Sequence, residues 1–264
     1  MKATCERDKL LHAFQMAASV APARSPKPIL QNVKLEVAKD GAILMGTDLE
    51  VGVRVEVPGF AIAAPGSVVL PRDRFGKILA ESSDEKLDLE CDGRMVLIRG
   101  QRSEFQLPSE NPDEFPSVLA FEEKKYHEMP ARFLHEVIRR TVYATDNESS
   151  RYALGGVLVE LSANGLTAVA TDGRRLARQE GPAKSVGGHV SGDNMTIIPT
   201  KTMQLLERAL ADNDENLQLA ARENDVLVKS GGATIYSRLV EGRFPKWRDV
   251  FPRREGMAKI DVTV

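Results

Sequence analysis

The chain has 264 residues, of which 42% are hydrophobic and 28% charged, a composition typical of a globular protein of one large or two ordinary domains. Its formal charge of -2 excludes nucleic-acid binding through overall charge, so such binding would need a local concentration of Lys and Arg. No apolar run approaches the roughly 18 residues of a membrane helix. Two isolated cysteines, Cys5 and Cys91, exclude a disulfide framework and favour a reducing, cytoplasmic environment.

An amphipathic helix is the first long element that the sequence predicts, after a short strand. Leu10, Phe14 and Ala17 recur at the three-and-four spacing of one buried helix face. A second helix is expected to begin with Pro71, whose fixed φ suits a helix start. Glycine-containing turns separate alternating strands around it. In chain order, the first half is predicted to hold helix 7–18, strand 33–37, helix 71–80 and strands 86–90 and 95–99.

The second half of the sequence repeats the first. Five segments return in the same order, with an offset that drifts only from 123 residues (9 to 132) to 129 residues (116 to 245). They are 9–14, 28–37, 46–49, 71–79 and 114–116, which return as 132–137, 152–161, 170–173, 199–207 and 243–245. The repeat predicts helices 131–143 and 200–211 and strands 157–161, 217–219 and 226–229.

The predicted fold class is therefore α+β, with two repeated domains that each pack two helices on antiparallel β-sheet. Domain boundaries are expected at 1–121 and 122–254. The alternating residues Ile260–Val264 resemble the opening strand of each copy. We therefore interpret 255–264 as the first strand of a third copy that the 264 residues do not contain, and the chain as truncated.

No motif of the sequence predicts an active site. The four histidines lack metal-ligand spacing, and neither an ATP-binding loop nor a nucleophile elbow is present. Asp48 and Asp172 each follow a threonine at equivalent places of the repeat, and a pair of carboxylates suits acid–base catalysis. A Thr-Asp pair at a strand end is more often a turn that binds local backbone, so a carboxylate enzyme ranks low, and no cofactor is expected.

Positive charge gathers on the predicted helices. Their residues total +6, which leaves -8 for the rest of the chain. Helices that face a polyanion, or merely solvated helix surfaces, explain this segregation equally well. The segment Arg24–Pro28 is basic, stiffened by proline and expected to stand out into solvent.

Four segments carry a resemblance to a known family. They are Pro28–Leu30, Gly46–Glu50, Val169–Leu176 and Val240–Pro245, and they resemble the bacterial DNA polymerase III β subunits, the sliding clamps. The resemblance extends in order from residue 1 to about residue 254. It implies the DNA-clamp fold, in which three domains form a chain and two chains close head to tail into a ring around duplex DNA. It also implies a non-catalytic processivity factor in the cytoplasm, without membrane contact.

The resemblance implies three sets of site residues and several partners. Residues that match DNA-proximal positions are Arg24, Arg74, Arg151, Tyr152 and Lys201. A groove for short hydrophobic peptides would include Leu154, Thr171, Gly173, Arg174, Arg175, Leu176, Pro245 and Val250, with its other half in a third domain. Phe105 and Leu107 match the subunit interface, and a place in the core explains them equally well. The implied partners are double-stranded DNA, the replicative polymerase, a clamp loader, other proteins with clamp-binding peptides and a second subunit.

The sequence departs from the family at three positions. Asp73 and Asp249 stand where the family commonly has a basic residue, and Ala153 stands where a second tyrosine occurs. A different class of function stays open beside the clamp. In that alternative, the chain is a two-domain module that binds peptides or proteins and does not encircle DNA.

Overall fold

Eighteen strands and four α-helices form two halves of the same design in the described residues of the computed structural model, which are 1–146, 153–191, 195–210 and 215–250. The first half contains β1 (Lys2–Glu6), α1 (Arg7–Ala18), β2 (Asn32–Ala38), β3 (Gly41–Thr47), β4 (Val51–Val57), β5 (Phe60–Ala64), β6 (Gly66–Pro71), α2 (Arg72–Glu81), β7 (Lys86–Cys91), β8 (Met95–Arg99) and β9 (Glu104–Pro108). The second contains β10 (Tyr126–Pro130), α3 (Ala131–Thr141), β11 (Gly156–Leu161), β12 (Gly165–Thr171), β13 (Leu176–Pro182), β14 (Lys184–Val186), β15 (Ile197–Pro199), α4 (Thr200–Ala209), β16 (Asn216–Ala221), β17 (Asp225–Ser230) and β18 (Ala233–Arg238). Short 3₁₀ helices are η1 (Pro28–Gln31), η2 (Pro112–Glu114), η3 (Val142–Ala144) and η4 (Trp247–Val250).

The strand order is identical in the two halves. The order β5-β1-β7-β8-β9 of the first half corresponds to β14-β10-β16-β17-β18 of the second, and β4-β3-β2-β6 corresponds to β13-β12-β11-β15. All of these strand pairs are antiparallel. The α+β prediction with two repeated domains is therefore confirmed. The expected third-copy strand at 255–264 lies outside the described residues.

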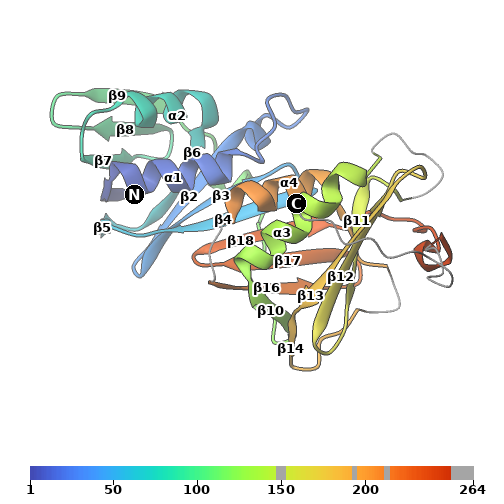
Figure 1. Cartoon of the computed structure of the whole chain (residues 1–264). Coiled ribbons are helices and arrows are strands. Elements are labelled where there is room, and N and C mark those ends of the chain that lie inside the picture. The colour runs from blue at the N-terminus through green and yellow to red at the C-terminus, as the bar shows by residue number, and fades with distance from the viewer. Residues whose placement is uncertain (147–152, 192–194, 211–214, 251–264) are drawn as a thin grey trace.

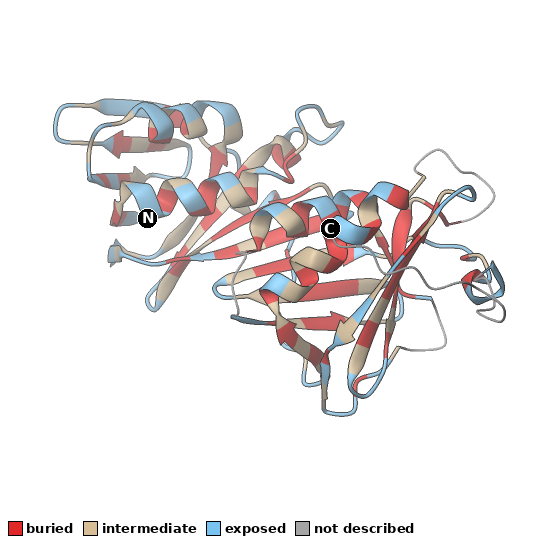
Figure 2. Cartoon of the chain, in the orientation of Figure 1, coloured by how far each residue is buried: buried red, intermediate tan, exposed pale blue. Residues whose placement is uncertain are grey.

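A single nine-stranded sheet joins the halves. It forms because β18 of the second half pairs with β4 of the first, with Ile235 opposite Val53 and Tyr236 opposite Gly52. The main hydrophobic core runs through this junction, since it contains Leu10 and Leu89 of the first half as well as Ile235 of the second. The two halves thus share both a sheet and a core (Figure 2).

The helices follow from their apolar periodicity and from the prolines that precede α2, α3 and α4. Leu10, Phe14 and Ala17 are buried along one face of α1, as predicted. Phe14 meets Phe75 of α2 edge-on, with ring centroids 5.0 Å apart, so the two helices of this half pack together. In Figure 1, α1, α4 and α3 follow one another across the molecule in front of the strands. Both halves therefore present helices on the same side of the shared sheet.

The helix ends differ slightly from their predictions. Pro71 lies one residue before α2, at the cap position, rather than at the first helical residue, and Pro199 holds the same position before α4. Their φ angles of -60° and -55° still lead directly into the helix. The predicted helix 131–143 ends at Thr141, after which η3 continues the chain in a tighter turn.

Candidate nucleic-acid interface and peptide-binding surface

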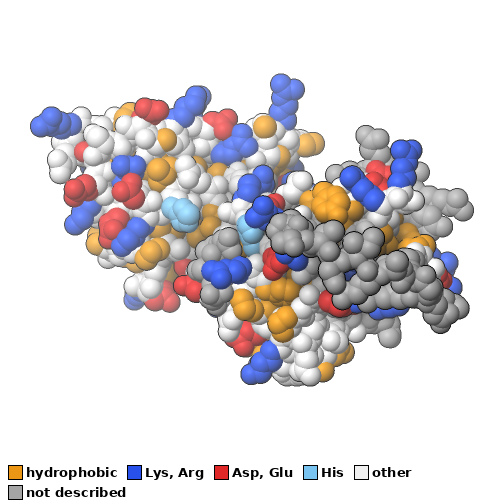
Figure 3. Space-filling view, viewed as in Figure 1, with side chains coloured by type: hydrophobic (Ala, Val, Ile, Leu, Met, Phe, Trp, Pro, Cys, Tyr) orange, Lys and Arg blue, Asp and Glu red, His pale blue; other side chains and the backbone are white. Residues whose placement is uncertain are grey.

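Exposed charge on the four α-helices is mostly positive. Eight exposed residues are basic and three are acidic: Lys9, Arg74, Lys77, Arg132, Arg139, Arg140, Lys201 and Arg208 against Asp8, Asp73 and Glu81. Because α2 extends to Glu81, the observed helices total +5 rather than the predicted +6. Figure 3 shows Lys and Arg scattered over this face with Asp and Glu among them. The helices thus offer dispersed cations, not one continuous basic patch.

The residues expected to contact DNA lie at three places. Arg24 is exposed in the loop before η1, and Arg74 is exposed on α2. Lys201 at the start of α4 forms an ion pair with Asp48 of the first half, yet its side chain keeps 67% of its surface exposed. It therefore links the two halves while remaining accessible. Arg151 and Tyr152 lie outside the described residues.

The turn that follows β12 brings several predicted groove residues together. The Thr171 hydroxyl donates to the carbonyl of Arg175 (2.7 Å) and accepts from the amide of Gly173 (3.0 Å). Gly173 has φ +85°, a backbone conformation that glycine adopts without strain. These bonds turn the chain back into β13, where Leu176 pairs with Thr171.

The carboxylate of Asp172 also holds this turn. Its Oδ1 accepts the amides of Arg174 and Arg175, each at 2.9 Å, and its Oδ2 accepts the Arg175 guanidinium at 2.9 Å. The two backbone amides, followed by the charge of Arg175, lower the pKa of the Asp172 carboxyl. Arg174 and Arg175 consequently stand on a rigid, exposed rim.

The apolar part of the predicted groove is partly buried. Leu154 is buried, Leu176 and Pro245 are half-buried, and Val250 is 69% exposed. Leu176 packs against a cluster that contains Ala153 and Phe244, the chain neighbours of Leu154 and Pro245. The amide of Ala153 donates to the carbonyl of Arg243 at 3.2 Å. The structure therefore brings the Leu154, Leu176 and Pro245 segments together around one small core.

Two features beside this surface escaped the sequence prediction. Tyr143 is 57% exposed, and the Arg175 guanidinium lies 5.5 Å from its ring centroid. The guanidinium carbon of Arg248 lies 4.2 Å from the centroid of the Trp247 ring, and Arg248 forms two hydrogen bonds with Glu160. Tyr143 and Arg175 are far apart in the sequence, so their contact could not be predicted from local patterns. Only the fold brings them together.

The two residues expected at a subunit interface differ in exposure. Phe105 on β9 is 39% exposed, whereas Leu107 two residues later is 7% exposed and belongs to the main core. The side chain of Phe105 is thus available to another molecule. Leu107 packs within the chain.

Nothing in the described part of the chain assembles catalytic groups. Asp48 Oδ1 accepts the amides of Glu50 and Val51, as Asp172 does in its turn. Burial raises the pKa of the Cys5 thiol to about 12, so that it stays protonated at neutral pH. The described residues contain no cluster of three or more metal-ligating side chains. None of their helices is both long and apolar enough to cross a lipid bilayer.

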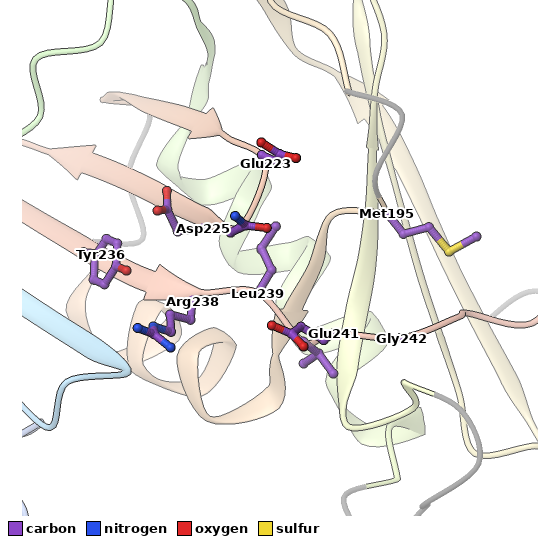
Figure 4. Close-up of a pocket in the computed structure, with 10 residues that line it drawn as sticks. Met195, Glu223, Asp225, Tyr236, Arg238, Leu239, Glu241 and Gly242 are labelled. Carbon is purple, nitrogen blue, oxygen red and sulfur yellow. The ribbon is translucent and has the colours of Figure 1, made fainter.

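A cavity of about 520 Å³ beside β17 and β18 likewise offers no reactive pair (Figure 4). Its Asp225 pairs with Arg222, and its Arg238 lies 3.8 Å from Glu50. None of the predicted site residues lines it. Pro245 instead lines a smaller cavity of about 400 Å³ beside Trp247.

Comparisons with known proteins agree with the resemblance. Residues 1–119 match the family described as DNA polymerase III beta subunit, N-terminal domain, and residues 128–246 match its central domain. The beta sliding clamp of Escherichia coli is 32% identical over 256 residues, which cover 96% of this chain and 68% of that protein.

Solved structures give the same result. A DNA polymerase sliding clamp from Bacillus subtilis superposes with a TM-score of 0.88 at 27% identity, covering 96% of this chain and 68% of that one. A sliding clamp from Pseudomonas aeruginosa bound to griselimycin superposes with a TM-score of 0.85 at 30% identity, covering 96% and 68%. The chain thus spans about two thirds of the length of these relatives.

Proposed function

Because the chain belongs to the bacterial DNA polymerase III beta subunit family, the β sliding clamps, we propose that it is a non-catalytic processivity factor of DNA replication. It forms part of a ring around duplex DNA and tethers the replicative polymerase there. Without an ATP-binding loop of its own, it depends on a separate clamp loader. Its place of action is the cytoplasm, where bacterial DNA is copied.

The dispersed cations of the helices are the observation that carries this proposal. A clamp that slides needs contacts that are numerous, weak and independent of sequence, and Lys and Arg supply them by pairing with phosphates. Arg24, Arg74 and Lys201 are all exposed for this role. No recognition helix or zinc finger is needed, since retention on DNA comes from ring topology rather than from affinity.

The segments around Leu154, Leu176 and Pro245 are proposed to form half of a groove for short hydrophobic peptides. Apolar anchors of a peptide would enter between these side chains, while Arg174 and Arg175 hold its polar groups. The replicative polymerase, the clamp loader and other replication or repair proteins would use this groove in turn. A relative that binds griselimycin supports a ligand-binding surface on this fold.

Retention on circular DNA tests the ring. The chain is loaded onto nicked circular duplex DNA by a bacterial clamp loader, and the DNA is then linearised. A topological clamp stays on the circle and slides off the linear form, so retention falls sharply on cutting. Equal retention on both forms would contradict encirclement. If peptide binding persisted in that case, the two-domain binding module would be the better description.

Exposed valines provide a matched test of the groove. Val250 is 69% exposed and Val190 is 53% exposed, so neither substitution by aspartate should unfold the chain. Binding of a fluorescent peptide of about six residues with leucine and phenylalanine anchors is measured by anisotropy. Val250→Asp is expected to weaken binding about tenfold, whereas Val190→Asp leaves it unchanged. Equal affinity of the two variants would remove Val250 from the groove.

A further inference from the structure

Lys201 differs from the other cations proposed to contact DNA, because it has a carboxylate partner. Its ammonium pairs with Oδ2 of Asp48, in the turn between β3 and β4 of the other half. Arg24 and Arg74 are also exposed, but neither forms an ion pair with another residue of the described ranges. A phosphate that approaches Lys201 therefore meets a protein anion that is already in place.

The Asp48 carboxylate is fixed by its own turn. Its Oδ1 accepts the amides of Glu50 and Val51 at 3.0 and 2.8 Å. The side chain is only 15% exposed, so the turn shields it from most of the solvent. Because Oδ1 is bound to the backbone, Oδ2 keeps its direction toward Lys201. A carboxylate held in this way cannot turn away when another anion approaches.

Lys201 has a fixed backbone and a free side chain. It is the second residue of α4, between Thr200 and Thr202. The Thr200 hydroxyl donates to the carbonyl of Gly155 at 2.9 Å. The Thr202 hydroxyl meets that of Ser237 on β18 at 2.7 Å, which holds the start of α4 beside the junction. The Lys201 side chain is nevertheless 67% exposed, and its flexible four-carbon stem lets the ammonium move.

The repeat separates this pairing from the turn itself. Asp172 forms the same turn in the second half, where its Oδ2 accepts the guanidinium of Arg175, three residues later. Val51 stands at the position of Arg175 in the first half, so the turn supplies no cation of its own to Asp48 at that position. The partner of the carboxylate comes from within the turn in one half and from α4 in the other.

A DNA phosphate and Asp48 compete for the same ammonium. The ammonium has three hydrogen-bond donors and could contact both anions at once. That arrangement brings two negative charges close together, and their repulsion weakens the contact with the phosphate. Lys201 therefore binds a phosphate less tightly than a lysine without such a neighbour would.

We propose that Asp48 is a positioning residue that holds the Lys201 ammonium and weakens its contact with DNA. The inference rests on the proposed clamp function and concerns how tightly that site holds the duplex. When the duplex moves, Asp48 accepts the ammonium that one phosphate releases, until the next phosphate arrives. The lysine then keeps an ionic partner throughout, which lowers the barrier between successive positions and favours sliding.

Binding of the 264-residue chain to fluorescent duplex DNA, measured by anisotropy over a range of salt concentrations, tests the proposal. Asp48→Asn removes the charge but keeps an oxygen that accepts the turn amides. It should tighten binding about three- to tenfold and make the slope of log K against log salt steeper by up to about 0.9, because Lys201 gains a full phosphate contact.

Asp92→Asn is the matched control for the change of charge. Asp92 Oδ1 accepts the amides of Arg94 and Met95, at 3.0 and 2.9 Å, in the hairpin between β7 and β8. The substitution thus removes the same charge from the same kind of turn, away from α4. It should change DNA affinity by less than about twofold, because salt screens distant charges.

A second substitution tests whether Asp48 acts through the lysine. In a Lys201→Ala background, Asp48→Asn should change DNA affinity by less than about twofold. An equal gain with and without Lys201 would mean that Asp48 repels DNA directly, which overturns the proposal. An Asp48→Asn chain that binds DNA no more tightly than Asp92→Asn overturns it as well.

The proposed function and the inference fail in different ways. If Lys201→Ala weakens DNA binding while Asp48→Asn leaves it unchanged, Lys201 contacts DNA and only the role of Asp48 is wrong. If Lys201→Ala leaves DNA binding intact, the proposed contact of Lys201 fails together with the inference. Circular dichroism melting checks the fold of every variant. Asp48→Ser, whose hydroxyl also accepts a turn amide, replaces Asp48→Asn if that variant is unfolded.

Discussion

Equivalent threonines and aspartates perform the same structural task in both halves. Thr47 Oγ1 donates to the carbonyl of Val51 (2.8 Å) and accepts the amide of Leu49 (2.9 Å), which repeats the bonds of Thr171. Leu49, at the position of Gly173, has φ +79°, a conformation that costs about 1 kcal/mol or more for a residue with a side chain. The turn bonds of Thr47 and Asp48 hold it there. The Asp48 carboxylate therefore holds the turn by accepting backbone hydrogen bonds, which is a structural role rather than a catalytic one.

Two buried histidines form the most unusual polar contact of the second half. His127 Nδ1 and His189 Nδ1 lie 2.7 Å apart, while each Nε2 faces a carbonyl, of Ser162 and Ala221 respectively. Carbonyls only accept hydrogen bonds, so both Nε2 atoms carry protons. The space between the Nδ1 atoms then admits at most one further proton. The native pair cannot take up two.

The His127–His189 pair is expected to make the folded chain less stable in acid. Burial, followed by the charge of His189, lowers the pKa of His127 below its usual 6.5. Below about pH 6.5 the unfolded chain then binds more protons than the native chain. The free energy of unfolding therefore keeps its full value above that pH and decreases as the pH is lowered further. One excess proton corresponds to a slope of at most about 1.4 kcal/mol per pH unit. Urea unfolding at pH 8, 6.5 and 5 measures this slope.

A His127→Gln variant is the control for the pH dependence. It removes one titrating ring and should flatten the slope between pH 6.5 and 5, although it lowers stability at pH 8. The comparison is therefore between slopes and not between absolute stabilities. Parallel curves for the variant and the wild-type chain would assign the acid sensitivity to other groups.

At the scale of elements, helix α2 provides a test of the phosphate contacts. Arg74 is exposed on α2, and Lys184 is exposed on the edge strand β14. If Arg74 pairs with a phosphate, Arg74→Glu should weaken DNA association and reduce the slope of log K against log salt by about 0.9. Lys184→Glu makes the same change of charge and should preserve more of the affinity. The free energy of unfolding of both variants should lie within about 0.5 kcal/mol of that of the wild type.

The comparison of Arg74→Glu with Lys184→Glu separates local contacts from net charge. If both variants lose the same amount of DNA affinity, binding depends on the overall charge of the protein rather than on Arg74. A larger loss of thermal stability than of DNA binding in Arg74→Glu would assign Arg74 a structural role.

The periodicity of apolar residues predicted the helices and strands more reliably than it predicted which side chains form a surface site. The four helices and the hairpins at glycine-containing turns follow from local residue patterns, and the helices are present, as are the hairpins β2–β3 and β11–β12. The repeat predicted that the halves share one topology, because homologous segments build the same fold. The ends of α1 match their prediction, whereas ends of α2, α3 and α4 were displaced by one or two residues, since apolar spacing does not specify the last turn.

The candidate sites depended on contacts between distant segments, which local patterns do not contain. The pairing of Lys201 with Asp48 requires β18 to meet β4, and no spacing in the sequence indicates that strand pair. Likewise, alternation along β9 did not separate exposed Phe105 from buried Leu107, although they lie on the same strand face. Only the packing of Leu107 into the main core, which the fold determines, distinguishes the two residues.

At the scale of the whole molecule, the junction makes the two halves one folding unit. The shared sheet is held by β18 and β4, by the Lys201–Asp48 pair and by a core that contains residues of both halves. Neither half can lose its core without exposing apolar surface of the other. We therefore expect a single cooperative unfolding transition in calorimetry rather than two.

A charge at the junction should separate that transition into two. Ile235→Asp places a carboxylate in the core where β18 meets β4, and it should cost about 3 kcal/mol or more. Phe105→Asp makes an equally polar change on β9, where the side chain is 39% exposed, and should cost about 1 kcal/mol or less. Urea unfolding gives both values. Similar costs for the two variants, or a single transition in Ile235→Asp, would mean that the halves are coupled through contacts other than this strand pair.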